Sequence, residues 1–217
     1  MWDPFKDLTG VSITVYAPSL ITVPTSLRVR DIKEFVELVK RSPGKLNFGN
    51  PGNGTSMHLN NELFKLAAGI HLTKIPYKGQ PPVLTDMLRG DVAMGVFSVG
   101  VAAPHIASGK LKPLAVVSEQ NVSSMHDVPT LTEAGYREAN VVPWYGLVVH
   151  DATPRPVAQR INNAINHALD SPDVQERLRG LATEPQTPRS PEQIAAVLRL
   201  DFEKYRQVIQ ASGITAE

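Results

Sequence analysis

A turn rich in glycine and proline stands directly before a helical pattern in the segment NFGNPGNGTSMHLNNELFK, residues 47–65. Glycine lets a backbone approach a ligand closely, and the first N–H groups of a helix lack partners within the helix. These groups and the helix dipole favour an anion. Thr55 and Ser56 add hydroxyls at the start of the helix. The chemistry that this segment suits is the binding of a phosphate or a carboxylate.

Two sharper interpretations of the same turn lack residues that they need. A phosphate-binding loop of the GxxxxGK[ST] type requires a lysine that is absent after Gly54. A nucleophile elbow requires G-x-S-x-G, which is also absent. The spacing alone therefore leaves two readings open, a carboxylate site and a plain strand-to-helix loop capped by Ser and Thr.

Composition limits the other classes of site. The 217 residues include no cysteine, and none of the six histidines has another histidine four residues away, so we expect neither a metal site nor a cofactor. The formal net charge is +1, with 22 Lys and Arg against 21 Asp and Glu. That balance argues against a nucleic acid as partner. A hydrophobic share of 42% is typical of a folded domain with a core.

Alternating strand and helix patterns position the turn. Strands are expected at 11–17, 45–50, 71–79, 91–99, 111–118 and 144–150, and helices around 32–39 and at 56–69, 80–90, 100–110, 153–171, 172–182 and 190–213, with a short helical piece at 130–135. Alternation over 33–118 predicts βαβ units around a parallel sheet, and thus an α/β class. In the helix after the turn, the expected apolar stripe is Leu59, Leu63, Leu66 and Ala67, and the expected cap is Gly69.

Several ordered motifs resemble one family. GNGTS at 52–56, IPYKG at 75–79 and VLTDMLRG at 83–90 resemble motifs of the substrate-binding proteins of tripartite tricarboxylate transporters, the TctC-like Bug receptors. PHIASGKLKPLAVVS, DVPTLTEAG, WYGLVV and the terminal ASGITAE match that family too. The resemblance covers essentially the whole chain.

The resemblance implies a periplasmic-binding-protein-like fold of type II, with one complete α/β lobe and an incomplete second lobe that carries the C-terminal helices. Residues 20–141 would form the complete lobe, and 1–19 with 142–217 the remainder of the family's first lobe. About the first third of the family's sequence, including its signal peptide, has no counterpart here. An incomplete lobe would expose strand edges, which favours a homodimer.

The resemblance also implies a set of ligand contacts. They fall in the turn, in the loop at 77–79, and in the segment where the family commonly carries an aspartate at the position of Phe97: Gly52, Asn53, Gly54, Thr55, Ser56, Tyr77, Lys78, Gly79, Phe97 and Ser98. Loss of that negative charge favours a plain carboxylate or an aromatic acid. For His58, Trp144 and Tyr145 we expect packing rather than ligand contact.

The function implied is that of a receptor for a small dicarboxylate or aromatic acid, without a catalytic role, which serves the membrane subunits of an uptake system. The family is periplasmic; a chain that opens without a signal peptide is also compatible with the cytoplasm. Two alternatives are a small serine hydrolase that uses Ser56 or Ser98 with a histidine, and an assembly module without a ligand.

Overall fold

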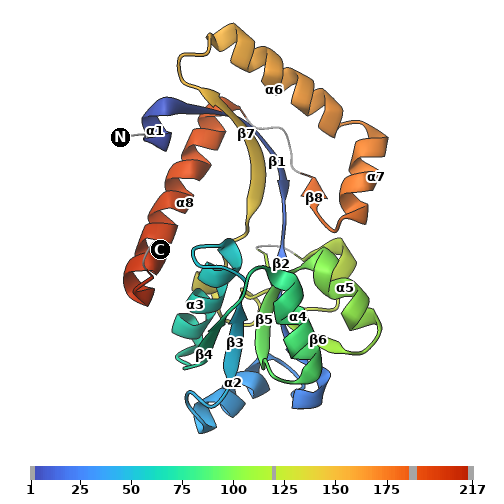
Figure 1. Cartoon of the computed structure of the whole chain (residues 1–217). Helices are drawn as coiled ribbons and strands as arrows, with labels where there is room; N and C mark the ends of the chain where they lie inside the picture. The colour runs from blue at the N-terminus through green and yellow to red at the C-terminus, as the bar shows by residue number, and fades with distance from the viewer. Residues whose placement is uncertain (1–2, 119–120, 186–189, 215–217) are drawn as a thin grey trace. The chain divides into compact units, whose positions relative to one another are not determined.

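The computed structural model describes residues 3–118, 121–185 and 190–214. These residues divide into two compact units (Figure 1). Unit 1 contains the residues up to 17 and residues 143–206, and unit 2 contains residues 18–142 and those from 207 onward. The last three residues of the ASGITAE motif lie outside the described residues.

Unit 2 is built on a five-stranded sheet with the order β4-β3-β5-β2-β6. The strands are β2 (Ser19–Pro24), β3 (Asn47–Asn50), β4 (Thr73–Pro76), β5 (Met94–Ser98) and β6 (Leu111–Val117). β3 pairs in parallel with β4 and β5, whereas β2 runs antiparallel to both β5 and β6. The parallel arrangement predicted over 33–118 is confirmed for β3 with β4 and β5, whereas β2, which lies before that range, makes the sheet as a whole mixed. β2 pairs with strands more than 70 residues later, and local periodicity does not encode such a pairing.

Helices α2 (Ile32–Arg41), α3 (Ser56–Ala68), α4 (Gln80–Arg89) and α5 (Val99–Ala107) surround this sheet (Figure 1). In α2 the side chain of Asp31 caps the first turn by accepting from the N–H of Glu34. The buried residues of α2 are Ile32, Phe35, Val36 and Val39, as their spacing predicted.

Consecutive residues of β3 show which helices lie on opposite faces of the sheet. The ring of Phe48 lies 4.8 Å from Nζ of Lys65 in α3. A Cβ added to Gly49 would collide with Val83 of α4. Because neighbouring side chains of a strand point to opposite faces, β3 lies between α3 and α4. The absence of a side chain at Gly49 permits α4 to pack closely on the strand that precedes the glycine-rich turn.

The apolar stripe expected for α3 is only half right. Leu59 and Leu63 are buried, but Leu66 is 49% exposed and Ala67 is exposed as well. Phe64 and Ala68 are buried in their place. The buried face of α3 also includes His58, Asn60 and Asn61, so polar residues occupy part of the stripe that the prediction reserved for apolar ones.

The short helical piece predicted at 130–135 is a turn instead. Glu133 accepts hydrogen bonds from the N–H of Thr130 at 2.8 Å and from its hydroxyl at 3.1 Å. Thr130 returns a bond by accepting from the N–H of Glu133. These reciprocal hydrogen bonds are those found at the start of a helix. Gly135, with a φ of 92°, ends the helical conformation after this single turn.

Unit 1 contains a three-stranded antiparallel sheet with the order β7-β1-β8. Its strands are β1 (Leu8–Tyr16), β7 (Trp144–His150) and β8 (Glu184–Pro185), and its helices are α1 (Pro4–Asp7), α6 (Arg155–Leu169), α7 (Pro172–Gly180) and the larger part of α8 (Pro191–Ser212). The buried side chain of Asn162 in α6 donates to the carbonyl oxygen of Val11 at 2.6 Å. Near the start of α8, Ile194 packs directly on Gly10 of β1.

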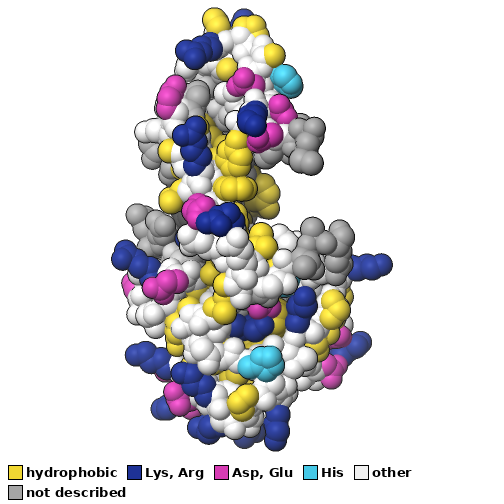
Figure 2. Space-filling model, turned by 90° about the vertical axis from the view of Figure 1, so that its left-hand side faces the viewer, with side chains coloured by type: hydrophobic (Ala, Val, Ile, Leu, Met, Phe, Trp, Pro, Cys, Tyr) yellow, Lys and Arg dark blue, Asp and Glu magenta, His cyan; other side chains and the backbone are white. Residues whose placement is uncertain are grey.

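The surface carries charges of both signs without a single basic patch on the face that Figure 2 shows. This agrees with the near-neutral balance of the sequence. None of the helices within the described ranges combines the length and the apolar character needed to cross a membrane.

Candidate functional site

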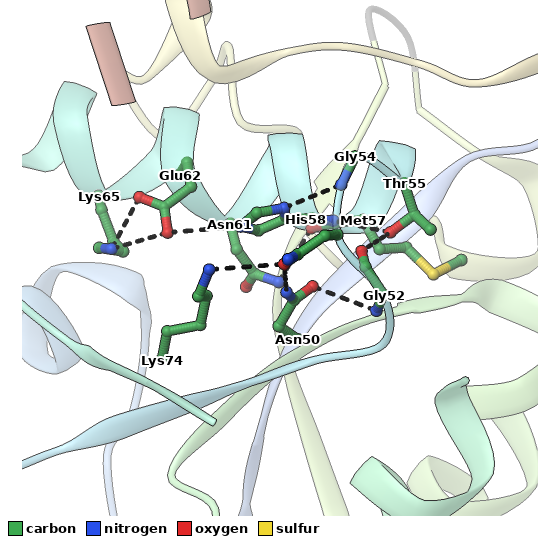
Figure 3. Close-up of polar contacts among 11 residues, drawn as sticks. Asn50, Gly52, Gly54, Thr55, Met57, His58, Asn61, Glu62, Lys65 and Lys74 are labelled. Carbon is green, nitrogen blue, oxygen red and sulfur yellow. Dashed lines mark hydrogen bonds and ion pairs between the residues drawn. The ribbon is translucent and has the colours of Figure 1, made fainter. Parts of the chain in front are cut away.

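The glycine-rich turn between β3 and α3 is held by its own hydrogen bonds (Figure 3). Asn50 donates from its amide to Oδ1 of Asn53 at 2.9 Å and accepts from the N–H of Gly52 at 3.3 Å. Lys74 of β4 approaches the same Oδ1 of Asn53 at 3.4 Å. These contacts fix the turn before any ligand arrives, and such preorganisation lowers the entropic cost of binding.

Thr55 caps α3, and its hydroxyl is used in hydrogen bonds within the turn. The hydroxyl donates to the carbonyl oxygen of Gly52 at 2.8 Å and accepts from the N–H of His58 at 3.3 Å. The next two N–H groups, those of Ser56 and Met57, have no acceptor within the described part of the chain. The unsatisfied donors of this turn are therefore backbone groups at the positive end of the helix dipole.

His58 links the turn to the body of α3. Its side chain is 1% exposed, and Nδ1 accepts from the N–H of Gly54 at 3.2 Å. Because an N–H only donates, this bond assigns the proton of the neutral ring to Nε2, which lies 3.9 Å from Oε1 of Glu62 (Figure 3). Burial lowers the pKa of His58 below 6.5, and the charge of Lys74 lowers it further. The structure thus assigns His58 a packing position, as the sequence analysis expected.

An ion pair between Lys65 and Glu62 lies beside His58. Lys65 donates to both carboxylate oxygens of Glu62, at 2.7 and 2.9 Å. Both side chains are largely buried, at 14% and 13% exposure. Since Glu62 already neutralises Lys65, this pair adds no net charge to the site.

The loop Tyr77-Lys78-Gly79 is tied to the turn by two backbone bonds. The N–H of Tyr77 donates to the carbonyl oxygen of Asn50, and the N–H of Gly79 donates to that of Pro51, both at 2.8 Å. The structure therefore brings together the first two predicted contact segments. The phenol of Tyr77, however, donates to Asp86 at 2.8 Å. Burial, followed by this bond, raises the pKa of Tyr77 to about 12.

The third predicted segment, Phe97-Ser98, ends β5. Phe97 is fully buried and its ring lies next to Gly95, so it forms part of the core of unit 2. Ser98 is half-buried. Its N–H donates to Oε1 of Gln80 at 3.0 Å, and its hydroxyl lies 3.4 Å from the same oxygen.

Gln80 is the residue at this end of the sheet that sequence reasoning missed. It is the first residue of α4 and follows Gly79 directly, so it connects the loop at 77–79 to Ser98. A polar side chain on the first residue of a helix, at the carboxyl end of a strand, was the available signal.

The remaining predicted residues differ in accessibility. Asn53, Gly54, Thr55 and Lys78 are exposed, and Gly52, Ser56, Tyr77 and Gly79 are half-buried. In unit 1, Trp144 donates from Nε1 to Asp201 at 2.6 Å, a packing role, and Tyr145 is 65% exposed. No group of three or more potential metal ligands occurs in the ranges that the structure describes.

Comparison with known proteins gives this arrangement a family context. The model of the tripartite tricarboxylate transporter family receptor, TctC, matches residues 1–214. Protein BugT from Bordetella pertussis is 30% identical over 215 residues, which cover 97% of this chain and 65% of that protein. The chain spans 61–65% of the length of six curated relatives that it matches.

Two solved structures are similar over nearly the whole chain. Rpa4515 of R. palustris, solved with adipate, is 27% identical with a TM-score of 0.85, covering 99% of this chain and 71% of that one. MatC from Rhodopseudomonas palustris, with bound malate, is 27% identical with a TM-score of 0.81, covering 96% and 71%. These similarities confirm the α/β, periplasmic-binding-protein-like fold class that the motifs implied.

Proposed function

Because the chain belongs to the family of tripartite tricarboxylate transporter receptors, we propose that it binds a small organic carboxylate at the carboxyl end of the unit 2 sheet. The observation that carries the proposal is the start of α3. There the N–H groups of Ser56 and Met57 have no acceptor within the described part of the chain, and the turn before them is closed by its own hydrogen bonds. Such a helix start is suited to an anion.

The proposed contacts refine the set inferred from the motifs. The N–H group of Ser56, the loop Tyr77-Lys78-Gly79 and Ser98 would contact the ligand, because hydrogen bonds link these segments to one another. The residues Gly52, Asn53, Gly54 and Thr55 would hold the start of α3 in place through the bonds of the turn. Phe97 supports the site from the core rather than by contact. Lys78 is the exposed cation of the set and adds a point charge that attracts an acid.

A dicarboxylate is the favoured ligand class. Two structural neighbours carry adipate and malate, which are both dicarboxylates. The phenol of Tyr77 donates to Asp86, so it offers a flat wall rather than a free donor. An aromatic acid is the second candidate ligand class, because its ring could pack against this wall.

The wider role that we propose is that of a periplasmic receptor without a catalytic function. It would deliver its ligand to the membrane subunits of the uptake system. Residues 20–141 would act as one lobe and residues 1–19 with 142–217 as part of the other. The hydrolase alternative gains no support, because neither Ser56 nor Ser98 hydrogen-bonds to a histidine in the part of the chain that the structure describes.

Thermal unfolding with a panel of acids tests the proposal. The panel is adipate, malate, succinate and benzoate, with the corresponding methyl esters as uncharged controls. At a ligand concentration ~100 times Kd, stabilisation is about 2.7 kcal/mol. For a chain of this size the melting temperature then rises by roughly 5–10 °C. If every acid leaves the melting temperature unchanged, the proposal is wrong and the assembly-module alternative is favoured.

Substitution of Ser56 separates the backbone donor from the hydroxyl. Thr55 has φ −69° and ψ 156°, a conformation that tolerates a following proline. Ser56→Pro places proline at the first position of α3, where it is well accepted, and removes one N–H. We expect Ser56→Pro to weaken carboxylate binding about tenfold with little change in stability. Ser56→Ala keeps the N–H and serves as the matched control. Equal binding by wild type and Ser56→Pro, measured by calorimetry, would contradict a contact at this amide.

A further inference from the structure

The N-terminus of α4 lies at the same end of the sheet as the proposed site, yet it is poor in backbone donors. Gly79 precedes the helix with a φ of 100° and provides no side-chain cap. Pro81 and Pro82 follow Gln80, and proline has no N–H. Two of the four N–H groups that an ordinary helix start leaves open are therefore missing here. Of the other two, the N–H of Gly79 is bonded to Pro51, so the N–H of Gln80 is the backbone donor left here, and a second donor has to come from a side chain.

Gln80 has a side chain of the required chemistry and a fixed orientation. Its Oε1 accepts from the N–H of Ser98 at 3.0 Å. Because that partner only donates, the oxygen and the nitrogen of the amide cannot be exchanged without loss of the bond. The Nε2 group is thus assigned as the outer donor. Within the described residues, no acceptor is bonded to this Nε2.

The position of Gln80 connects all three segments of the proposed site. Gly79, its neighbour in sequence, donates to Pro51 of the glycine-rich turn. Ser98, its hydrogen-bond partner, is the residue that precedes α5. The half-buried amide therefore lies at the junction of the loops that follow β3, β4 and β5. In open α/β sheets, ligands bind at the carboxyl ends of such strands.

We propose that Gln80 is a specificity-determining residue: its Nε2 donates to a carboxylate oxygen of the ligand while Oε1 stays bonded to Ser98. The inference rests on the proposed carboxylate-binding function. A neutral donor with a fixed orientation selects ligands that present an acceptor at this point. It disfavours ligands that present an N–H there, because two donors would then face each other without an acceptor.

The test is the substitution Gln80→Glu, which is nearly isosteric. One carboxylate oxygen can still accept from the N–H of Ser98, while the other replaces the Nε2 donor with an acceptor. Affinity is measured by calorimetry for adipate or malate, whichever binds wild type more tightly, and for its monoamide. We expect Gln80→Glu to bind the diacid about tenfold or more weakly. We expect it to bind the monoamide more tightly than wild type does, since the amide N–H now meets an acceptor.

The gain for the monoamide separates direct contact from long-range repulsion. A negative charge that acts only at a distance weakens the binding of both the diacid and the monoamide, so the affinity for the monoamide does not rise. Loss of affinity for the diacid and the monoamide without any gain, or unchanged affinity for both, would overturn the role of Gln80. If wild type binds no acid of the panel, the proposed function fails and this inference fails with it.

Two further variants complete the design. Gln80→Met removes both acceptor and donor, and we expect it to narrow the preference for the diacid over the monoamide, even if Gln80→Glu folds poorly. Gln193→Glu is the matched control, because Gln193 also accepts from a backbone N–H, that of Ser190 at 2.9 Å, at the start of α8. The control should bind both ligands as wild type does. A preference for the diacid that persists unchanged in Gln80→Met would count against the proposal.

Discussion

His58 shows how one buried side chain stabilises a loop that consists largely of glycine. Its Nδ1 accepts a hydrogen bond from the N–H of Gly54, and its backbone N–H donates to the hydroxyl oxygen of Thr55. The turn is therefore closed from both the strand side, through Asn50, and the helix side, through His58. We predict that His58→Ala destabilises the fold by ~1–3 kcal/mol, from a lost acceptor and a cavity. His58→Asn, whose Oδ1 can replace Nδ1 as acceptor, should lose less.

The same residue gives a prediction on pH. The pKa of His58 in the folded chain lies below the usual 6.5, because burial and Lys74 oppose the charge. The folded state thus binds fewer protons at this site than the unfolded state. Its contribution to stability is fully present above pH ~6.5 and is lost as pH falls through the lower, folded pKa. Denaturant unfolding at about pH 7.5 and pH 5 should show a smaller loss in His58→Asn than in wild type. An equal loss in both proteins would rule out His58 as the titrating group.

At the scale of the element, α3 is defined by its two ends. Thr55 caps its start, and Gly69 ends it in the left-handed region with a φ of 60°. The N–H of Gly69 donates to the carbonyl oxygen of Leu66 at 3.2 Å. A side chain at such a backbone conformation is strained by about 1 kcal/mol. The length of α3, and with it the position of the turn at its start, depends on both caps.

We predict that Gly69→Ala lowers the free energy of unfolding by ~1 kcal/mol, which corresponds to a fall in melting temperature of roughly 2–4 °C. The matched control is Gly180→Ala at the end of α7. There the backbone is not left-handed and no atom lies within 4 Å of the added Cβ. That substitution should be neutral or stabilise by up to ~1 kcal/mol. Equal effects of the two substitutions would show that backbone strain does not decide the end of α3.

At the scale of the whole molecule, the two units differ in how completely they cover their apolar residues. In unit 1, Tyr145, Leu147 and Val148 of β7 are 65%, 45% and 46% exposed. β7 is also an edge strand of its sheet. An exposed apolar edge strand is a template for pairing with another chain. The expected homodimer therefore stays a prediction, for which β7 is the proposed contact.

Leu147→Lys tests this contact, because a lysine on an edge strand opposes strand pairing. We expect light scattering to report a dimer for wild type and a monomer for Leu147→Lys, with an unchanged circular dichroism spectrum. Leu66→Lys on α3 is the matched control, since Leu66 has a similar exposure of 49% and lies on a helix. A monomeric wild type, or a dimer that both variants leave intact, would contradict pairing through β7.

The sequence by itself determined what depends on neighbouring residues. The spacing of Ile32, Phe35, Val36 and Val39 predicted the buried face of α2. The glycine-rich turn, the cap at Gly69 and the order of strands and helices were also readable, because each rests on a local backbone preference. Together with the family motifs, these patterns were enough for the fold class and the approximate place of the site.

Only the tertiary structure decided which residues distant in sequence meet. It placed β2 antiparallel to β5 and β6, directed the phenol of Tyr77 to Asp86, buried Phe97 and joined Gln80 to Ser98 across 18 residues. None of these is encoded by a local period, since each depends on how strands pair and how helices pack after the chain has folded. The start of α3 can be predicted from Thr55 and Ser56. Which N–H groups remain as donors for a ligand depends on the folded turn, because hydrogen bonds within the turn already use some of them.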